Sequence, residues 1–284
     1  MKQQLLFSPS ELHESLKKGQ CTVVDCRFAL TDPAAGYRDF LEGHIPGAVY
    51  AHLDDDLSSP VTVNTGRHPL PDKNAFATFL ARCGWQAGKT LVAYDSAGGV
   101  IAARLWWLMK YFGHDCAALL DGGFAAWQSA GYELESGPAT PVATNPIELV
   151  ARDELVMSTT DIPAYLQGQN NVLVDVRAAE RYRGELEPLD TVAGHIPGAV
   201  NYPLQQNLSK NGCFRSAQQI RDDMSALSKD RTSSEVVYMC GSGVTACHAI
   251  FAAELAGLLG SVLYAGSWSE WIRDPSRPVE SVQN

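Results

Sequence analysis

The sequence predicts an α/β protein made of two tandem domains, each a parallel sheet with helices on both faces. Two observations lead to this prediction. The residues Gly-His-Ile-Pro-Gly-Ala-Val occur twice, at positions 43–49 and 194–200, and in both halves short apolar runs alternate with segments of helical periodicity. Strands that alternate with helices form parallel sheets whose two faces are covered, so each half is expected to fold in this way.

Four further matches between the halves occur in the same order along the chain, which indicates the duplication of one domain. They pair Ser8–Glu11 with Ser158–Asp161, Val23–Arg27 with Leu173–Arg177, Leu91–Asp95 with Val236–Cys240, and Gly122–Trp127 with Ala265–Trp271. Between the halves lies a proline-containing stretch that is typical of a semi-rigid connector. The predicted first domain therefore covers residues 1–136, the linker 137–149 and the second domain 150–284.

The individual elements follow from the same patterns. Short apolar runs bounded by turn residues predict strands at Thr22–Cys26, Leu91–Tyr94, Ala117–Leu120, Val172–Val176, Val236–Met239 and Val262–Tyr264. Helical periodicity predicts helices at Pro9–Lys18, Ala75–Cys83, Val100–Phe112, Thr159–Gln167, Ala217–Ser228 and Val244–Leu258. Ser8 and Ser158 are the expected N-caps of the first helix of each half, because each has an acidic residue three positions later.

Composition and charge exclude several classes of function. Lys and Arg number 22 against 32 Asp and Glu, and this net charge of −10 has the wrong sign for a nucleic-acid-binding surface. The most apolar stretch, Ala249–Gly260, contains Glu254 and is too short to cross a bilayer, and the N-terminal apolar stretch is too short for a secretory signal. Seven cysteines, an odd number, favour reduced thiols. We therefore expect a cytoplasmic protein without membrane or nucleic-acid partners.

The candidate nucleophile is Cys240, which stands at the end of the most apolar strand of the second half. In open parallel sheets, ligands bind at the carboxyl ends of strands. The cysteine is followed by Gly241, Ser242 and Gly243, and then by a long helix that starts near Val244 and Thr245. The two glycines let successive N–H groups converge on one point, and the helix N-terminus adds partial positive charge there. Such a site stabilises a thiolate; a cysteine without this role would be a small buried hydrophobic residue.

Three cysteine-dependent chemistries could use this loop. A cysteine phosphatase needs an arginine six residues after the nucleophile, where this chain has Ala246. A thiol protease needs its own sequence context around the cysteine, and this chain does not have it. Transfer of a sulfur atom through a persulfide remains, because it requires only N–H donors around the outer sulfur.

The paired His-Ile-Pro-Gly-Ala segments, the Cys-Gly-Ser-Gly-Val-Thr loop at 240–245 and the Gly-Ser-Trp-Ser-Glu-Trp segment at 266–271 resemble two-domain rhodanese-type sulfurtransferases. The loop is most similar to the 3-mercaptopyruvate sulfurtransferase branch. This resemblance implies that the second domain holds the catalytic cysteine and that the first domain is inactive. The first half agrees, because it has Asp95-Ser96 where the second has Met239-Cys240.

The resemblance also implies roles for other residues. Arg181 would bind the anionic donor, and the backbone of Gly241, Gly243, Val244 and Thr245 would hold the donor sulfur. Ser242 would assist as a catalytic residue, in some relatives through a relay that corresponds to His44 and Asp32. Mercaptopyruvate-specific relatives carry a second arginine nine residues after the first, where this chain has Asp190, as thiosulfate-type relatives do.

Structural alternatives stand beside these roles. Arg181 could instead pair with Asp175 or Glu180. His44 lies in the first copy of the duplicated motif, which is expected to be inactive, and His195 lies at the same place in the second copy. A histidine present in both copies favours a structural role for each. Asp32 precedes a proline and is typical of a turn, and the segment Gly66–Pro71 is either a plain turn or a loop near the site.

The sequence thus predicts an enzyme that moves a sulfane sulfur from 3-mercaptopyruvate to a thiol or cyanide through a Cys240 persulfide. The uncharged Gly241 and Ser242 favour this donor over the dianion thiosulfate. The alternatives are a thiosulfate:cyanide sulfurtransferase and a persulfide carrier that serves a protein partner. The expected partners are a small anionic donor and a thiol or cyanide acceptor, a thioredoxin-like protein among them. No metal and no cofactor are expected, because no His, Cys and carboxylate cluster has metal-binding spacing and no dinucleotide loop is present.

Overall fold

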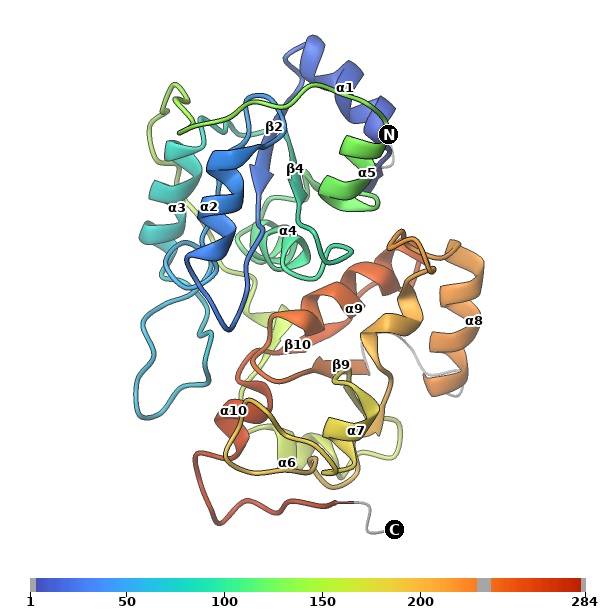
Figure 1. Ribbon diagram of the computed structural model, residues 1–284. Helices are drawn as coiled ribbons and strands as arrows, with labels where there is room; N and C mark the ends of the chain where they lie inside the picture. The colour runs from blue at the N-terminus through green and yellow to red at the C-terminus, as the bar shows by residue number, and fades with distance from the viewer. Residues whose placement is uncertain (1–3, 229–235, 282–284) are drawn as a thin grey trace. The chain divides into compact units, whose positions relative to one another are not determined.

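The computed structural model describes residues 4–228 and 236–281, which form two compact units (Figure 1). The first unit comprises Met1–Ser59, Leu70–Arg152 and Ser209–Phe214, and the second comprises Pro60–Pro69, Asp153–Leu208 and Arg215–Asn284. The units follow the two halves of the repeat, but two segments differ from the predicted boundaries. Residues 60–69 of the first half pack with the second unit, and residues 209–214 of the second half pack with the first.

The first unit contains a five-stranded parallel sheet in the described residues, in the order β1-β5-β4-β2-β3. Its strands are β1 (Leu6–Phe7), β2 (Cys21–Asp25), β3 (Val49–Tyr50), β4 (Thr90–Tyr94) and β5 (Ala117–Leu120). Its helices are α1 (Pro9–Lys17), α2 (Ala35–Glu42), α3 (Lys73–Arg82), α4 (Ala102–Tyr111) and α5 (Gly123–Ser129). The predicted capping box of α1 is present, because Ser8 and Glu11 each bind the other's backbone N–H.

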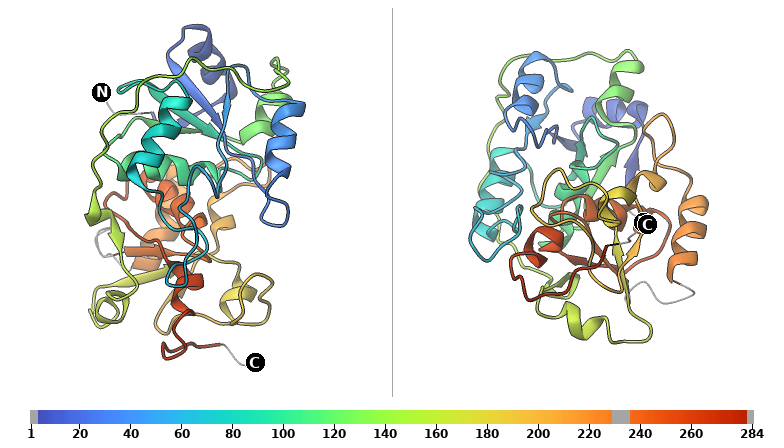
Figure 2. Two further views of the ribbon diagram at one scale, coloured as in Figure 1. Left: turned by 90° about the vertical axis from the view of Figure 1, so that its left-hand side faces the viewer. Right: turned by 60° about the horizontal axis from the view of Figure 1, so that its bottom comes forward.

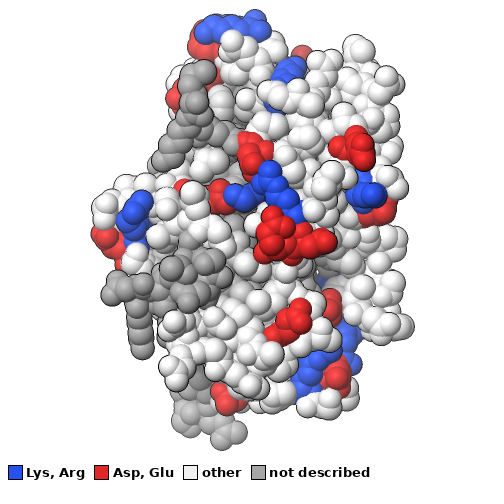
Figure 3. Space-filling view, turned by 180° about the vertical axis from the view of Figure 1, so that it is seen from behind, with Lys and Arg blue, Asp and Glu red and all other residues white. Residues whose placement is uncertain are grey.

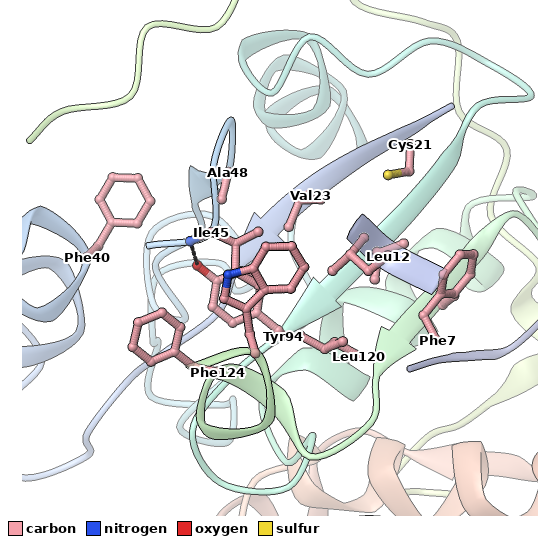
Figure 4. Packing of buried hydrophobic residues seen from close by; sticks show 13 residues of the cluster. Phe7, Leu12, Cys21, Val23, Phe40, Ile45, Ala48, Tyr94, Leu120 and Phe124 are labelled. Carbon is pink, nitrogen blue, oxygen red and sulfur yellow. Dashed lines mark hydrogen bonds between the residues drawn. The ribbon is translucent and has the colours of Figure 1, made fainter. Parts of the chain in front are cut away.

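One face of this sheet is covered by α1, α2 and α5, which contribute Leu12, Phe40 and Trp127 to a single buried cluster (Figure 4). Alternate residues of β4 face this cluster, as the two-residue period of a strand requires. Tyr94, at the end of β4, places a hydroxyl inside it. That hydroxyl donates a hydrogen bond to Asp25 and accepts one from the N–H of Ile45.

The second unit repeats this architecture. Within the described residues its sheet has five parallel strands, in the order β6-β10-β9-β7-β8. They are β6 (Val156–Met157), β7 (Val172–Asp175), β8 (Val200–Asn201), β9 (Val236–Met239) and β10 (Val262–Tyr264). The helices are α6 (Ile162–Tyr165), α7 (Ala179–Tyr182), α8 (Ala217–Ser228), α9 (Thr245–Leu255) and α10 (Ser267–Trp271), with short 3-10 helices at Asp153–Leu155 and Leu204–Asn207. The predicted α/β fold with two parallel sheets is confirmed.

Buried ion pairs also occur in duplicate. Arg27 binds both carboxylate oxygens of Asp25 and the carbonyl of Gly43, and Arg177 binds Asp175 and the carbonyl of Gly194 in the same way. Each pair is buried and ties the end of one strand to the duplicated Gly-His-Ile-Pro-Gly segment. The sequence repeat therefore preserves a structural bond in both units.

The two histidines of the duplicated segment have matching surroundings. His44 stacks on Phe40 with ring centroids 3.9 Å apart, and its Nδ1 lies 2.8 Å from the Phe40 carbonyl. His195 stacks on Tyr182 at 3.8 Å, and its Nδ1 lies 2.8 Å from the Tyr182 carbonyl. Equal contacts in both units support the structural reading of His44.

Charged side chains are intermixed on the face that Figure 3 shows, where Lys and Arg lie beside Asp and Glu. None of the helices in the described parts of the chain has the length and apolar character needed to span a membrane.

Candidate active site

Cys240 directly follows β9 and stands before the loop that leads into α9; Figure 1 labels both elements. Its side chain is only 1% exposed. The N–H of Gly243 points back and donates a hydrogen bond to the Cys240 sulfur at 3.1 Å. The Cys240 N–H donates to the hydroxyl of Ser267, and its carbonyl accepts from the N–H of Trp268, so the backbone of this candidate nucleophile is fixed on both sides.

The loop has this shape because its glycine has no side chain. Gly243 has a φ of +76°, and a Cβ at this position would lie 2.2 Å from the carbonyl oxygen of Ala265. Any other residue would push the loop away from the turn before α10. Ser267 itself has a φ of +53°, and its hydroxyl bridges the Cys240 N–H and the Tyr264 carbonyl. Of the N–H groups expected to converge here, that of Gly243 donates to the Cys240 sulfur.

Ser242 is paired with a histidine that the sequence analysis did not select. Its hydroxyl lies 2.7 Å from Nδ1 of His68, and both side chains are buried. His68 belongs to the segment Pro60–Pro69, which is part of the second unit. The pair thus brings a group that can carry a proton next to the candidate nucleophile.

Contacts to α10 and its C-terminal flank hold this segment in place, and Figure 2 shows it in light blue beside the red α10. The N–H of Gly66 donates to Glu270, and the N–H of Arg67 donates to the Ser269 hydroxyl at 3.0 Å. Nε of Arg273 donates to the carbonyl of Thr65. The Gly-Arg-His-Pro loop noted in the sequence is therefore part of the site and not a plain turn.

Arg181, on α7, lies in a network of charged groups. It donates to Glu187 through Nε and Nη2, and its Nη2 also lies 3.2 Å from Asp190. Asp190 in turn binds Arg67 with its other oxygen. The alternative partners considered for Arg181, Asp175 and Glu180, are not the ones it has.

Two guanidinium groups lie beside Gly241, the residue that follows Cys240. A Cβ on Gly241 would be 2.9 Å from Nη2 of Arg67 and 3.5 Å from Nη1 of Arg181. Burial raises the pKa of the Asp190 carboxyl, while the positive charge of Arg67 and Arg181 opposes this effect. Asp190 stands where mercaptopyruvate-specific relatives are expected to carry a second arginine. Here its carboxylate binds an arginine from another segment, Arg67.

The first unit provides an internal comparison for the Cys240 loop. Tyr94 pairs with Asp25 as Met239 pairs with Asp175, so Asp95 and not Ser96 occupies the position of Cys240. The buried Asp95 carboxylate accepts four backbone N–H bonds of 2.7–2.9 Å, from Ala97, Gly99, Ile101 and Ala102. In the first unit, the loop after the central strand therefore encloses a carboxylate group.

The remaining predicted residues have local partners. His44 and Asp32 both belong to the first unit; Asp32 is exposed and pairs with Arg38, which holds its pKa below the usual aspartate value. The relay through these two residues stays a prediction, and the histidine next to the Ser242 hydroxyl in the second unit is His68. Val244 is buried at the N-cap of α9 and Thr245 begins that helix.

The other cysteines differ from Cys240 in their contacts. Cys247 is buried in α9, and its thiol donates to the carbonyl of Gly243 at 3.3 Å. Burial raises the pKa of the Cys21, Cys83 and Cys116 thiols. Among the residues that the structure covers, no group of three or more His, Cys, Asp or Glu is arranged to hold a metal ion.

Comparison with known proteins places this arrangement in a family. The Rhodanese-like domain matches residues 8–130 and 158–274. The chain belongs to the rhodanese-like family. It is 45% identical over 278 residues to a probable 3-mercaptopyruvate sulfurtransferase from Pseudomonas aeruginosa. The alignment covers 96% of this chain and 97% of that protein.

Two further relatives of this rhodanese-like chain are informative. Thiosulfate sulfurtransferase from Mus musculus is 32% identical, over 94% of this chain and 92% of that protein. The solved structure of 3-mercaptopyruvate sulfurtransferase from Leishmania major superimposes with a TM-score of 0.82 at 31% identity, and covers 94% of this chain and 74% of that one. The chain is therefore a sulfurtransferase enzyme.

Proposed function

We propose that this enzyme moves a sulfane sulfur from 3-mercaptopyruvate to a thiol or to cyanide through a persulfide on Cys240. The observation that carries this choice of donor is the Ser242–His68 pair beside the nucleophile, with its 2.7 Å hydrogen bond. Release of pyruvate leaves a basic enolate that needs a proton, whereas release of sulfite from thiosulfate does not. A buried hydroxyl paired with an imidazole suits the first reaction.

In the first half-reaction, the Cys240 thiolate attacks the sulfur of 3-mercaptopyruvate. A sulfur–sulfur bond forms, the carbon–sulfur bond breaks, and its electron pair passes to the carbon fragment as an enolate. Ser242 donates a proton to the enolate, and His68 replaces that proton through Nδ1. Pyruvate leaves, and Cys240 carries the additional sulfur.

In the second half-reaction, an acceptor attacks the outer sulfur of the persulfide. Cyanide becomes thiocyanate, or a thiolate becomes a new persulfide, and the sulfur–sulfur bond electrons return to Cys240 as thiolate. We propose a thiol acceptor in the cell, with a thioredoxin-like protein as one candidate, in the cytoplasm. All seven cysteines lie within the described residues as free thiols, which supports a reducing compartment.

The loop supports this step by donating backbone N–H groups to sulfur. Gly243 already donates to the Cys240 sulfur. The equivalent of Gly243 in the first unit is Gly99. Ile101 and Ala102, whose N–H groups bind Asp95, lie two and three positions after Gly99, as Thr245 and Ala246 do after Gly243. We propose that these two N–H groups bind the outer sulfur, at the amino end of α9, where the helix dipole favours negative charge.

The test compares the two donors in matched variants. Ser242→Ala and His68→Gln should each lower kcat with 3-mercaptopyruvate by about 10- to 100-fold, within the usual range for loss of a general acid. Turnover of thiosulfate should stay within about threefold. Equal losses with both donors, or a wild-type preference for thiosulfate, would contradict the proposed donor and favour a thiosulfate:cyanide sulfurtransferase.

A further inference from the structure

The two guanidinium groups beside Gly241 are only partly satisfied by the protein. Arg67 uses Nη1 on Asp190, and Arg181 uses Nε and Nη2 on Glu187 and Asp190. The atoms nearest the missing side chain of Gly241 are Nη2 of Arg67 and Nη1 of Arg181. Neither atom has a hydrogen-bond acceptor within residues 4–228 and 236–281. Two donors next to the nucleophile are therefore available to a ligand.

The guanidinium of Arg67 is not needed to hold its own segment. The backbone N–H groups of Gly66 and Arg67 bind α10, and Arg273 binds the carbonyl of Thr65. These contacts do not involve the Arg67 side chain, which stays about a quarter exposed at 27%. The bond between the Arg67 guanidinium and Asp190 therefore has a role other than holding the segment in place.

Asp190 spaces the two arginines and balances their charge. One carboxylate oxygen binds Arg67 and the other binds Arg181. The connected network also includes Arg177, Asp175 and Glu187, and its three arginines face three carboxylates. Because the network is formally neutral, a donor with one negative charge is accommodated more easily than a dianion of similar size.

We propose that Arg67 is a second donor-binding residue, and that Asp190 sets the charge of this site in favour of a monoanionic 2-keto carboxylate over a compact dianion. This inference rests on the proposed function, because it names the groups that bind the donor of that reaction. The carboxylate and keto oxygens of such a donor would accept from Nη2 of Arg67 and Nη1 of Arg181. Planar guanidinium groups suit two neighbouring oxygens.

Binding can be measured without turnover in the Cys240→Ser protein. Isothermal titration calorimetry with 3-mercaptopyruvate would compare that protein with versions that also carry Arg67→Met, Arg67→Lys or Arg273→Met. Loss of one charge-assisted hydrogen bond is expected to raise Kd by about 10- to 100-fold in Arg67→Met. Arg67→Lys should recover part of this loss, and Arg273→Met, which removes an arginine that only holds the loop, should stay within about twofold.

A second titration tests the charge argument with thiosulfate as the ligand. Asp190→Asn in the Cys240→Ser background should improve thiosulfate binding relative to 3-mercaptopyruvate by about fivefold or more, because it removes one negative charge beside the ligand. An unchanged Kd in Arg67→Met, or an equal rise in Arg273→Met, would overturn the role of Arg67. A donor ratio that Asp190→Asn leaves unaltered would overturn the role of Asp190. Steady-state turnover of the wild type tests the proposed function separately, because the titrations measure only binding, in protein that carries Cys240→Ser.

Discussion

Replacing Asp95 with Asn should destabilise the first unit, because the carboxylate of Asp95 accepts hydrogen bonds from four backbone N–H groups of its loop. The side chain is 1% exposed, so water cannot substitute for it. An asparagine amide offers one oxygen, and its NH₂ group would face the two N–H groups that bound the other oxygen. Two buried donors would then lack an acceptor.

The magnitude follows from the cost of an unsatisfied buried donor, which is about 1–3 kcal/mol for each group. Two such groups give a loss of about 2–6 kcal/mol in the free energy of unfolding of this unit. For a unit of this size, that corresponds to a fall in Tm of at least about 4 °C. Calorimetry or urea unfolding followed by tryptophan fluorescence would measure the change.

Asp72→Asn is the matched control for this experiment. Asp72 caps α3 and also accepts two backbone N–H bonds, from Asn74 and Ala75, but through a single oxygen at an exposed position. Asparagine caps a helix as well as aspartate does, so this variant should stay within about 0.5 kcal/mol of the wild type. If Asp95→Asn were as mild as Asp72→Asn, the loop would not be an anion site, and the inference from Asp95 to the Cys240 loop would be refuted.

Three further predictions concern stability and the second thiol. Asp175→Ala should cost about 3–5 kcal/mol in urea unfolding, because it leaves the buried Arg177 without its main partner. Ser8→Ala should lower the free energy of unfolding by about 1 kcal/mol at neutral pH, because the cap of α1 is lost. The Ser8 hydroxyl and amide lower the pKa of Glu11, so this loss should become smaller as the pH falls through the glutamate range. Unfolding measured at several pH values would show the change. Cys247→Ala should keep kcat/KM within about twofold in steady-state assays, and a loss comparable to that of Cys240→Ser would assign the chemistry to the wrong thiol.

The regular elements of the fold could be predicted because their signals are local. The central strands are continuous apolar runs, and β5, β9, β10 and α8 have the predicted bounds. The elements that the sequence did not indicate have weak local signals. The edge strands β1, β3, β6 and β8 are two residues long, and α2 starts at an alanine N-cap without a side-chain hydrogen bond.

The site was predictable only where one segment contains all of its parts. The loop after Cys240 could be interpreted from its glycines and the helix that follows. The partner of Ser242 could not, because His68 is 174 positions away and reaches the site through the packing of an irregular segment. The role of Asp190 could not be predicted for the same reason. Its negative charge alone predicts a weaker donor site, but its carboxylate binds Arg67, which is distant in the sequence.

The central claim is that Cys240 carries the transferred sulfur, and intact-protein mass spectrometry tests it most directly. After exposure to 3-mercaptopyruvate without acceptor, wild-type protein and Cys247→Ala should each gain the mass of one sulfur atom, peptide mapping should place it on Cys240, and cyanide or a small thiol should remove it. Cys240→Ser should gain nothing. A sulfur atom on another cysteine, or turnover without any adduct on Cys240, would contradict the account, and an adduct on Cys240 that neither acceptor discharges would instead identify a persulfide carrier.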